Sequence, residues 1–587
     1  MSDRSAEDAQ HSAARGRLRV LMGLLALLTL VHLWQITREA AWRELQVDDY
    51  IDLHHAWLIS TGQPPWLHAF DNHGSLECWP VAALIRLGGG RLVTQRWAVW
   101  LFYLVDLAIL ALVFFHFHRR GRAPEGLVAV FLMTSSLLIR QHLGDVRGEA
   151  MALLALLAAL EIASGETRES RAGSWLCGVL IGAAILMNQK CLYFMPLFAA
   201  AYLLVWPLGT ALRKTLALGV AAALVGLVFV VYLHRGGALG IFLEQNFVWP
   251  FKVSLPSLMW RKVMSSSFLG PMLLNNAWFI ACCLYALACE VRRYWPGAGP
   301  GPTTGDLETP DAAGTARTRV FVTVVAAGSV LTFVANPFPH LYNYLLVGPF
   351  LILLAAPVVV QLLGSFARAP FRPVALLLML GFCHTEMVLP FLVGRHALTG
   401  AEQLAVLERA DALPGPGEPV LDSCGRFYRP SGTWRLPIAA FTGELFRAKV
   451  FEPIGAELMA RRCRLIFWDG MLEEFLLPVD KELIRQSYVS LGDPLLVLGC
   501  RAAASATGEA TLSVRLDGSY RIQLEPERAG VTTILRDDRP LSLTGAAHWR
   551  AGTHRLRVPP GTADVAVFAD LPGLPADFRL PPARPTR

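Results

Sequence analysis

Long apolar runs separated by polar connections fill the first two thirds of this 587-residue chain. A helix needs about 20 mostly apolar residues to cross a membrane. The chain is 54% hydrophobic and only 17% charged, whereas soluble proteins are nearer about 25% charged. We therefore predict a polytopic α-helical membrane protein with about eleven spans. The expected spans are Val20–Ile36, Trp97–Phe115, Leu127–Ile139, Met151–Ala163, Trp175–Met187, Leu192–Trp206, Leu216–Leu233, Met272–Cys289, Val320–Val334, Tyr344–Leu363 and Val374–Val393.

Lysine and arginine are concentrated in every second connection between these runs, and such connections belong in the cytoplasm. With an odd number of spans, the loop after the first span and everything after residue 393 lie outside. The net charge of +7 is explained by these residues, and no Lys/Arg-rich tract indicates nucleic-acid binding. The N-terminal tail is too polar, and the next run too long, for a cleaved signal peptide. The basic residues are Arg15, Arg17, Arg19, Arg119, Arg120, Arg122, Arg168, Arg171, Arg213, Lys214, Arg292, Arg293, Arg317, Arg319, Arg368 and Arg372.

Composition divides the chain into a cytoplasmic tail (1–19), a transmembrane domain (20–393) and two C-terminal periplasmic domains. Short apolar runs that alternate with helical patterns predict an α/β domain at 394–505. Period-two patterns predict a β-rich, sandwich-like domain at 506–587, with a hairpin turn at Asp517-Gly518. Neither domain contains a catalytic motif. The cysteines show neither CxxC nor zinc spacing, and outside the membrane a disulfide is permitted but not implied.

The opening loop, Val47–Trp79, carries the densest set of chemically active side chains. A carboxylate pair can take a proton from a hydroxyl or hold a cation, and indole rings suit sugars or lipid headgroups. A solvated amphipathic loop resting on the membrane is the plainer alternative. The side chains are Asp48, Asp49, Asp52, His54, His55, Trp57, Trp66, Asp71, His73, Glu77 and Trp79.

Three further connections predicted to lie outside are more polar than topology requires. Asp145, Arg147 and Glu149 precede the fourth span, where acids also favour the helix dipole. Lys190, after Asn188-Gln189, contradicts the positive-inside trend and either binds a lipid phosphate or snorkels to the headgroups. The third is Asn336–His340, with Tyr342 just beyond it. Within the spans Asp106, His384 and Glu386 are ionisable, and we interpret Asp106 as a structural residue paired to another helix.

In their order and spacing these residues resemble the integral-membrane GT-C glycosyltransferases, specifically the bacterial family 39, protein O-mannosyltransferase-like and aminoarabinose-transferase-like branch. The resemblance covers roughly residues 20–393. Two departures concern Asp49, where the family has Glu, and Gly148-Glu149, where it has Pro-Asp. The matching segments are Asp48-Asp49, His55-Ala56-Trp57, Gly62-Gln-Pro-Pro-Trp66, Arg147-Gly148-Glu149, Gln189-Lys190, and Pro339-His340 with Tyr342.

The resemblance implies an inverting transfer of a sugar from a polyprenyl-phosphate donor to a glycan, lipid or protein acceptor. The reaction would occur at the outer face of a bacterial cytoplasmic membrane. Asp49, with Asp48 as the second candidate, is expected to be the base that deprotonates the acceptor hydroxyl. Expected substrate-binding residues are His55, Trp57, Trp66, Asp71, His73, Arg147, Glu149, Gln189, Lys190, Arg261, Lys262, His340 and Tyr342.

No cofactor is required if lysine and arginine neutralise the leaving phosphate, although two adjacent acids could hold Mg²⁺ or Mn²⁺. A transporter or flippase of a lipid-linked or small polar substrate is the alternative function, with Asp106, His384 and Glu386 along its pathway. Against it, the polar residues gather at one face and the sequence shows no inverted repeat. A membrane-anchored scaffold that displays the C-terminal domains would leave the opening loop unexplained.

Overall fold

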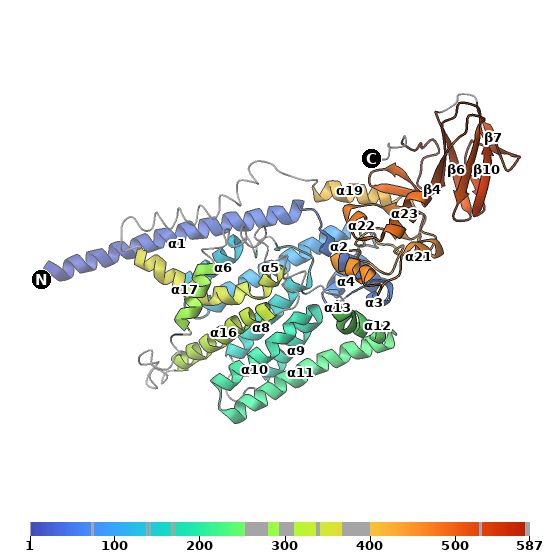
Figure 1. Cartoon of the computed structure of the whole chain (residues 1–587). Coiled ribbons are helices and arrows are strands. Elements are labelled where there is room, and N and C mark those ends of the chain that lie inside the picture. Colours follow the sequence, from blue (N-terminus) through green and yellow to red (C-terminus); the bar gives the residue numbers. More distant parts are fainter. Residues whose placement is uncertain are drawn as a thin grey trace.

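The apolar runs form helices that lie side by side in one bundle (Figure 1). The computed structural model describes residues 2–71, 75–136, 139, 142–165, 170, 172–252, 280–290, 292, 310–335, 341–366, 399–526 and 531–581. The bundle contains α1 (Ser2–Trp42), α5 (Thr94–His118), α6 (Ala123–Ser135), α8 (Gly148–Gly165), α9 (Ala172–Met187), α10 (Phe194–Val205), α11 (Leu208–Arg235), α16 (Pro310–Ala335) and α17 (Gly348–Phe366).

Four helices in the described part of the chain are long and apolar enough to cross a membrane: Gly16–Trp42, Thr94–His118, Gly148–Gly165 and Leu208–Arg235. Each expected span up to Tyr344–Leu363 overlaps a described helix, and Met272–Cys289 is described from Ile280 onward. The last, Val374–Val393, lies outside the described residues, so the number of spans stays a prediction. Shorter apolar helices are Ala123–Ser135, Ala172–Met187, Gln189–Val205, Ile280–Glu290 and Gly348–Gly364.

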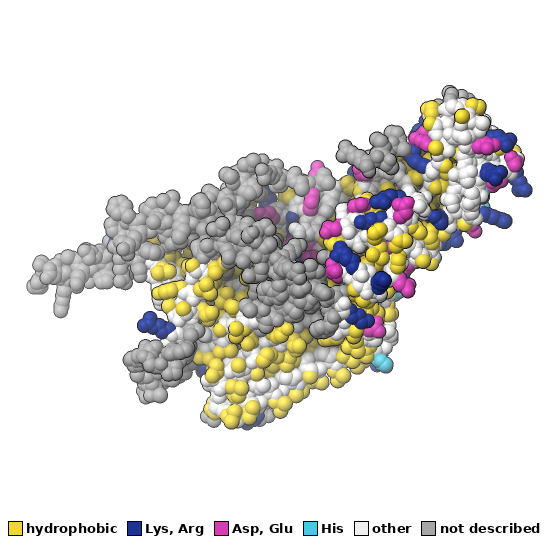
Figure 2. Space-filling model, viewed as in Figure 1, with side chains coloured by type: hydrophobic (Ala, Val, Ile, Leu, Met, Phe, Trp, Pro, Cys, Tyr) yellow, Lys and Arg dark blue, Asp and Glu magenta, His cyan; other side chains and the backbone are white. Residues whose placement is uncertain are grey.

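Small residues allow close approach between the helices of the bundle. A Cβ at Gly178 of α9 would lie 2.3 Å from the carbonyl oxygen of Leu218 on α11, so only glycine fits there. The opposite side of α11 keeps large apolar side chains exposed, among them Leu216 and Val228. Figure 2 shows hydrophobic side chains spread over this part of the molecule, while charged side chains gather over the C-terminal region. An exposed apolar surface of this extent is typical of contact with lipid.

The opening loop folds into short helices at the end of the bundle where α1 finishes (Figure 1). Gln46 precedes the first of them, and its backbone amide donates to Asp49 one turn further on, an arrangement that begins a helix. A second set of short segments follows α11 and lies beside it. The elements are α2 (Val47–Ser60), α3 (Pro65–His68) and α4 (Cys78–Leu87), then α12 (Leu239–Leu243), η2 (Glu244–Val248) and α13 (Trp249–Lys252).

Beyond α19 (Gly400–Asp411), the C-terminal region contains small helices and two sheets. The larger sheet is seven-stranded in the order β1-β2-β4-β11-β6-β9, with β3 also on β4, and the smaller is β5-β10-β7-β8. The elements are β1 (Val420–Leu421), α20 (Ala440–Arg447), α21 (Gly455–Ala460), β2 (Leu465–Phe467), α22 (Gly470–Phe475), α23 (Pro478–Ser487), β3 (Tyr488–Gly492), β4 (Leu495–Ala503), β5 (Glu509–Val514), β6 (Gly518–Glu525), β7 (Thr533–Arg536), β8 (Arg539–Ser542), β9 (Ala547–Trp549), β10 (Gly552–Arg557) and β11 (Asp564–Ala569).

Strand β4 joins the two parts that we predicted as the domains 394–505 and 506–587. Its first residues pair with β2 and β3, and its later residues pair with β11. The predicted hairpin at Asp517-Gly518 is wrong, because β5 pairs with β10 whereas β6 pairs with β11 and β9. Residues 515–517 therefore carry the chain from one sheet to the other. Apolar and polar residues alternate with a period of two both in a hairpin and in strands of two different sheets, so this pattern could not distinguish the two arrangements.

The C-terminal region packs directly on the opening loop. Gln403 of α19 exchanges two hydrogen bonds with the backbone of Leu45, at 2.9 and 3.1 Å. The backbone amide of Phe70 donates to Leu436, and the Phe70 ring packs on Phe441 with centroids 5.3 Å apart. The opening loop and the C-terminal region therefore lie at the same end of the bundle, as the charge pattern predicts.

Candidate functional site

Arg43, directly after α1, connects two carboxylates that are distant in sequence. One guanidinium nitrogen donates to Asp49 at the start of α2, and the other donates to Asp145 in the connection between α6 and α8. Both acids are buried, and a guanidinium can satisfy two carboxylates at once because its donors form a rigid fork. The ion pairs therefore fix the end of α1 to the start of α2 and to the loop before α8.

Asp49 is anchored on both of its oxygens. Oδ1 accepts from the backbone amide of Val146 at 2.7 Å, and Oδ2 accepts from the amide of Gln46 at 2.7 Å and from Arg43. The residue is only 1% exposed. Burial raises the pKa of Asp49 to about 6, against the positive charge of Arg43, which lowers it. Asp49 thus holds the loop before α8 in place.

The loop before α8 is also held from within the bundle. Asp106 of α5 accepts a hydrogen bond from the amide of Gly144, a residue with φ of +77°. Asp106 was interpreted as paired to another helix; its partner is instead the backbone of this loop. His142 Nδ1 lies 3.0 Å from Asp145 Oδ2. Burial alone would raise the pKa of Asp145, but the His142 hydrogen bond and the charge of Arg43 outweigh it and lower that pKa.

Asp48, the neighbour of Asp49, has a different environment. Its side chain is 51% exposed, and Oδ2 lies 3.0 Å from Nη2 of Arg147. Arg147 also approaches Glu149, with Nε 3.6 Å from Oε2. Glu149 Oε1 accepts from the Asn188 side-chain amide at 2.8 Å, and Lys190 is close enough to feel the charges of these groups. An accessible carboxylate and the guanidinium of Arg147 therefore face each other at the end of the bundle, with the buried Lys190 within range of their charges.

A second acidic cluster lies deeper in the opening loop. Asp52, Asp71 and Glu77 repel one another, and burial, followed by this repulsion, raises the pKa of Asp52 and of Glu77. His55 Nδ1 lies 3.6 Å from Asp71 Oδ2. The Cys78 thiol donates to the backbone oxygen of Asp52 at 3.4 Å. This cluster thus combines carboxylates with an imidazole and a thiol.

The connection after α11 closes one side of the opening loop, where the sequence indicates a polar segment lying along the membrane surface. Gln245 accepts from the amide of Asp71 at 3.0 Å and donates to the oxygen of Trp66 at 3.1 Å. Asn246 donates to the oxygen of Asp71 at 3.3 Å and accepts from the Gln189 side chain. Asn246 therefore connects Gln189 to the opening loop.

Trp66, which we expect to bind substrate, lies inside the core of the opening loop. It is 1% exposed and packs edge-on against Phe229 and Phe242, with centroids 5.6 and 5.5 Å away. A ring enclosed in this way offers no face to a ligand. Trp57 is also buried, 5.3 Å from the ring of His54. Both indoles therefore contribute to the core of the loop, and their role in substrate binding stays a prediction.

Some predicted site residues lie outside the described part of the chain. These are His73, Arg261, Lys262 and His340, together with the intramembrane residues His384 and Glu386. Tyr342 belongs to η4 (Leu341–Leu346), which precedes α17. Three of the four predicted polar places meet at one end of the bundle: the opening loop, the loop before α8 and the turn at η1 (Gln189–Tyr193), which opens α10.

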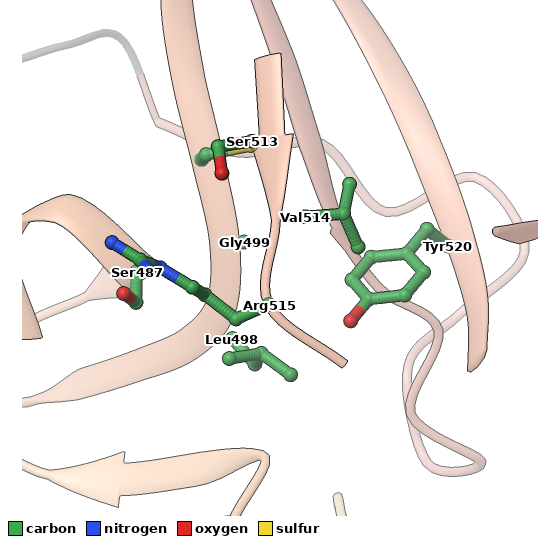
Figure 3. A pocket seen from close by; sticks show the side chains of 8 residues that line it. Ser487, Leu498, Gly499, Ser513, Val514, Arg515 and Tyr520 are labelled. Atoms are coloured by element: carbon green, nitrogen blue, oxygen red, sulfur yellow. The ribbon is translucent and has the colours of Figure 1, made fainter. Parts of the chain in front are cut away.

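The pocket in Figure 3 lies between β4, β5 and β6 of the C-terminal region, where Ser487, Arg515 and Tyr520 surround it. It has room for about one water molecule. A sugar or lipid does not fit there, so the polar end of the bundle is the candidate site.

No protein-family model and no curated protein matches the sequence. The chain is similar to solved structures of the oligosaccharyltransferase AglB from Archaeoglobus fulgidus at 12% identity. The apo form gives a TM-score of 0.35 over 67% of this chain and 54% of that one, so this chain spans about half of its length. The complex with an inhibitory peptide and a dolichol-phosphate gives a TM-score of 0.41, over 80% of this chain and 73% of that one. The complex with Zn and sulfate gives a TM-score of 0.44, over 84% of this chain and 72% of that one. Such low scores establish neither a family nor an activity.

Proposed function

We propose that the chain is a membrane glycosyltransferase that moves a sugar from a polyprenyl-phosphate donor to a hydroxyl acceptor at the outer face of a cytoplasmic membrane. The observation that carries the proposal is the exposed Asp48 carboxylate, held 3.0 Å from Arg147. An acid that can accept a proton and cations that can bind a phosphate are the two requirements of this reaction.

The position of the site favours a lipid-linked donor. The polar cluster lies at the end of apolar helices whose outer surfaces suit lipid, so a polyprenyl chain can lie in the membrane while its sugar phosphate reaches Arg147. No nucleotide sugar is present outside the cell. The chain contains no phosphate-cradling glycine loop of the kind that nucleotide-binding sites use.

The proposed reaction is a single displacement. The acceptor oxygen attacks the anomeric carbon, and its proton passes to the carboxylate of Asp48. The bond between the anomeric carbon and the phosphate oxygen breaks, and its electron pair leaves with the polyprenyl phosphate. Arg147 and Lys190 stabilise the negative charge that grows on that oxygen. Attack from the face opposite the leaving group inverts the anomeric configuration.

Accessibility changes the order of the two candidates for the base. From sequence, Asp49 is preferred, but its oxygens accept from Arg43, Gln46 and Val146 and its side chain is 1% exposed. Asp48 is half exposed and borders Arg147. A base must come within hydrogen-bonding distance of the proton that it removes. We therefore assign proton transfer to Asp48 and positioning of the loop to Asp49.

The positions of Asp48 and Asp49 also bear on whether this pair of acids could bind Mg²⁺ or Mn²⁺. Asp48 and Asp49 face different partners, Arg147 and Arg43, so the adjacent pair does not present its oxygens to one cation. Arg43 already supplies positive charge between Asp49 and Asp145. In the proposed reaction the leaving phosphate is neutralised by Arg147 and Lys190.

Membranes from cells that express the chain or lack it test the proposal. Lipid extracts of cells without the chain should accumulate a polyprenyl-phosphate sugar, and added wild-type membranes should consume it and release polyprenyl phosphate. A transporter would instead move the sugar lipid across sealed vesicles without breaking the anomeric bond. That result, with no phosphate released, would contradict the glycosyltransferase assignment.

A further inference from the structure

Three side chains of metal-binding type converge between α2 and α4. Asp52 and His55 lie one helical turn apart on α2, and Cys78 is the first residue of α4. A carboxylate oxygen, an imidazole nitrogen and the thiol sulfur from these residues all lie within 4.8 Å of one another. A four-coordinate zinc ion holds its ligand atoms about 3–4 Å apart, so small side-chain movements bring them into coordination.

Glu77 provides an independent indication that a cation belongs here. It directly precedes Cys78 and is 2% exposed, and its Oε2 accepts no hydrogen bond from any residue that the structure describes. It also lies within the field of Asp52 and Asp71, which repel its charge. A buried carboxylate oxygen without a partner is costly. A bound cation would satisfy this oxygen and neutralise the cluster.

His55 is oriented by a neighbouring acid, as metal-binding histidines usually are. Its Nδ1 lies 3.6 Å from Asp71 Oδ2, and Asp71 in turn accepts a hydrogen bond from the Ser75 hydroxyl. A carboxylate beside one ring nitrogen fixes the orientation of the ring, as in carboxylate–histidine–zinc sites. Asp71 is thus a supporting residue rather than a ligand.

The donor types select the kind of ion. Magnesium and calcium prefer oxygen ligands alone, whereas a thiolate together with an imidazole and a carboxylate suits zinc. We propose that Asp52, His55 and Cys78 bind one zinc-type divalent ion, and that the neighbouring Glu77, whose Oε2 has no hydrogen-bond partner among the described residues, balances its charge. The ion clamps α2 to α4 and so holds the helix that carries Asp48. It takes no part in the sugar transfer, and the site stands whether or not the proposed function is correct.

Metal analysis of the full-length chain, purified in detergent without chelators, tests the site. Wild-type protein should contain about one zinc per chain. After the zinc is replaced by Co²⁺, the absorption spectrum should show a thiolate-to-cobalt charge-transfer band. Cys78→Ser should remove this band and the stoichiometric zinc. Glu77→Gln should weaken zinc binding by roughly 10- to 100-fold.

Cys177→Ser is the matched control, because Cys177 is equally buried but lies in α9, where its thiol donates to the Ala159 oxygen. This variant should keep both zinc and the charge-transfer band. The cobalt spectrum of the wild type decides the question even if Cys78→Ser fails to fold. Wild-type protein without zinc and without a sulfur-to-cobalt band would overturn the proposal and leave protons as the neutralising charge.

Discussion

The guanidinium of Arg147 lies 3.0 Å from the exposed carboxylate of Asp48. Asp48 lies in the first turn of α2 and Arg147 lies in the connection before α8, and only the folded chain brings them together. Their charges serve opposite purposes in the proposed reaction, because the acid takes the acceptor's proton and the cation binds the donor's phosphate.

Removal of Arg147 or Lys190 should impair use of the donor. We expect Arg147→Ala and Lys190→Ala to reduce kcat/KM for the lipid donor by about 10²–10³, because stabilisation of the leaving phosphate is lost. The KM of the acceptor should change little. Transfer assays in membranes, with donor and acceptor varied separately, measure this difference. Arg213→Ala is the control. Arg213 lies in α11, and its side chain donates a hydrogen bond of 3.0 Å to the Gly209 oxygen one turn earlier in the same helix. Unchanged donor kinetics for Lys190→Ala would show that this residue only snorkels.

Arg43 should be important for stability, because it neutralises two buried carboxylates. Arg43→Met leaves Asp49 and Asp145 without their shared cation, and we expect a loss of about 3–5 kcal/mol in the free energy of unfolding. Arg485→Met is the matched control, because Arg485 and its partner Glu482 are 65% and 56% exposed. That surface pair should contribute less than about 1 kcal/mol. Unfolding in detergent measures both, and equal losses would contradict the bridging role of Arg43.

The rate of transfer should depend on the ionisation of Asp49. Burial raises the pKa of Asp49 to about 6, so the residue is charged above that pH and neutral below it. As the pH falls through about 6, protonation of Asp49 weakens its ion pair with Arg43 and so changes the position of the loop that carries Arg147, although the fold as a whole is not weakened. We therefore expect kcat/KM to fall on the acid side with an inflection near pH 6. Asp49→Asn should be slower but should lack this inflection, and its persistence would assign it to another group.

The raised pKa of Asp49 also makes the free energy of unfolding depend on pH. The folded-state pKa of Asp49 lies above the value of about 3.9 of an unfolded chain. Between these two values the folded state binds more protons, so the contribution of Asp49 to the free energy of unfolding decreases as the pH rises from about 4 to about 6. Above about 6 it is constant. The difference in stability between the wild type and Asp49→Asn should follow this course.

Topology can be tested with two matched glycines. Gly62 follows α2 and Gly121 follows α5; both have positive φ, and a Cβ at either would meet no atom within 4 Å. In a background without reactive native cysteines, a membrane-impermeant thiol reagent should label Gly62→Cys in intact cells but not Gly121→Cys. The Gly121 variant should become labelled after permeabilisation. Labelling of Gly121→Cys in intact cells would reverse the orientation and place the site in the cytoplasm.

The helices were predictable because apolar composition and loop charge are local properties. Each described helix of the bundle corresponds to an apolar run, and the polar segments at Asp48, Arg147 and Lys190 stood out because membrane insertion alone does not require them. The connection between β5 and β6 was misassigned because the same alternation serves both a hairpin and a crossing between sheets.

The remaining parts of the site depend on contacts that no local pattern encodes. Arg43 looks like an ordinary basic residue after a membrane helix, and only the fold shows that it joins Asp49 to Asp145. Asp106 hydrogen-bonds the backbone of Gly144, a partner that has no sequence signature. The burial of Trp66 is equally invisible in the sequence, since an indole near a membrane is typical of both a core and a binding surface.

The most direct test of the account compares Asp48→Asn with Asp49→Asn in membranes that contain donor lipid. Asp48 is half exposed, so Asp48→Asn should leave thermal stability unchanged while transfer falls by at least about 10²-fold. Asp49→Asn removes the ion pair with Arg43, and its oxygen can still accept from the Val146 amide, so it should slow transfer only through the position of the loop. If Asp48→Asn transfers sugar at nearly the wild-type rate while a stably folded Asp49→Asn does not, the base is Asp49. If both variants keep near wild-type transfer, the loop is not the active site and the central claim is wrong.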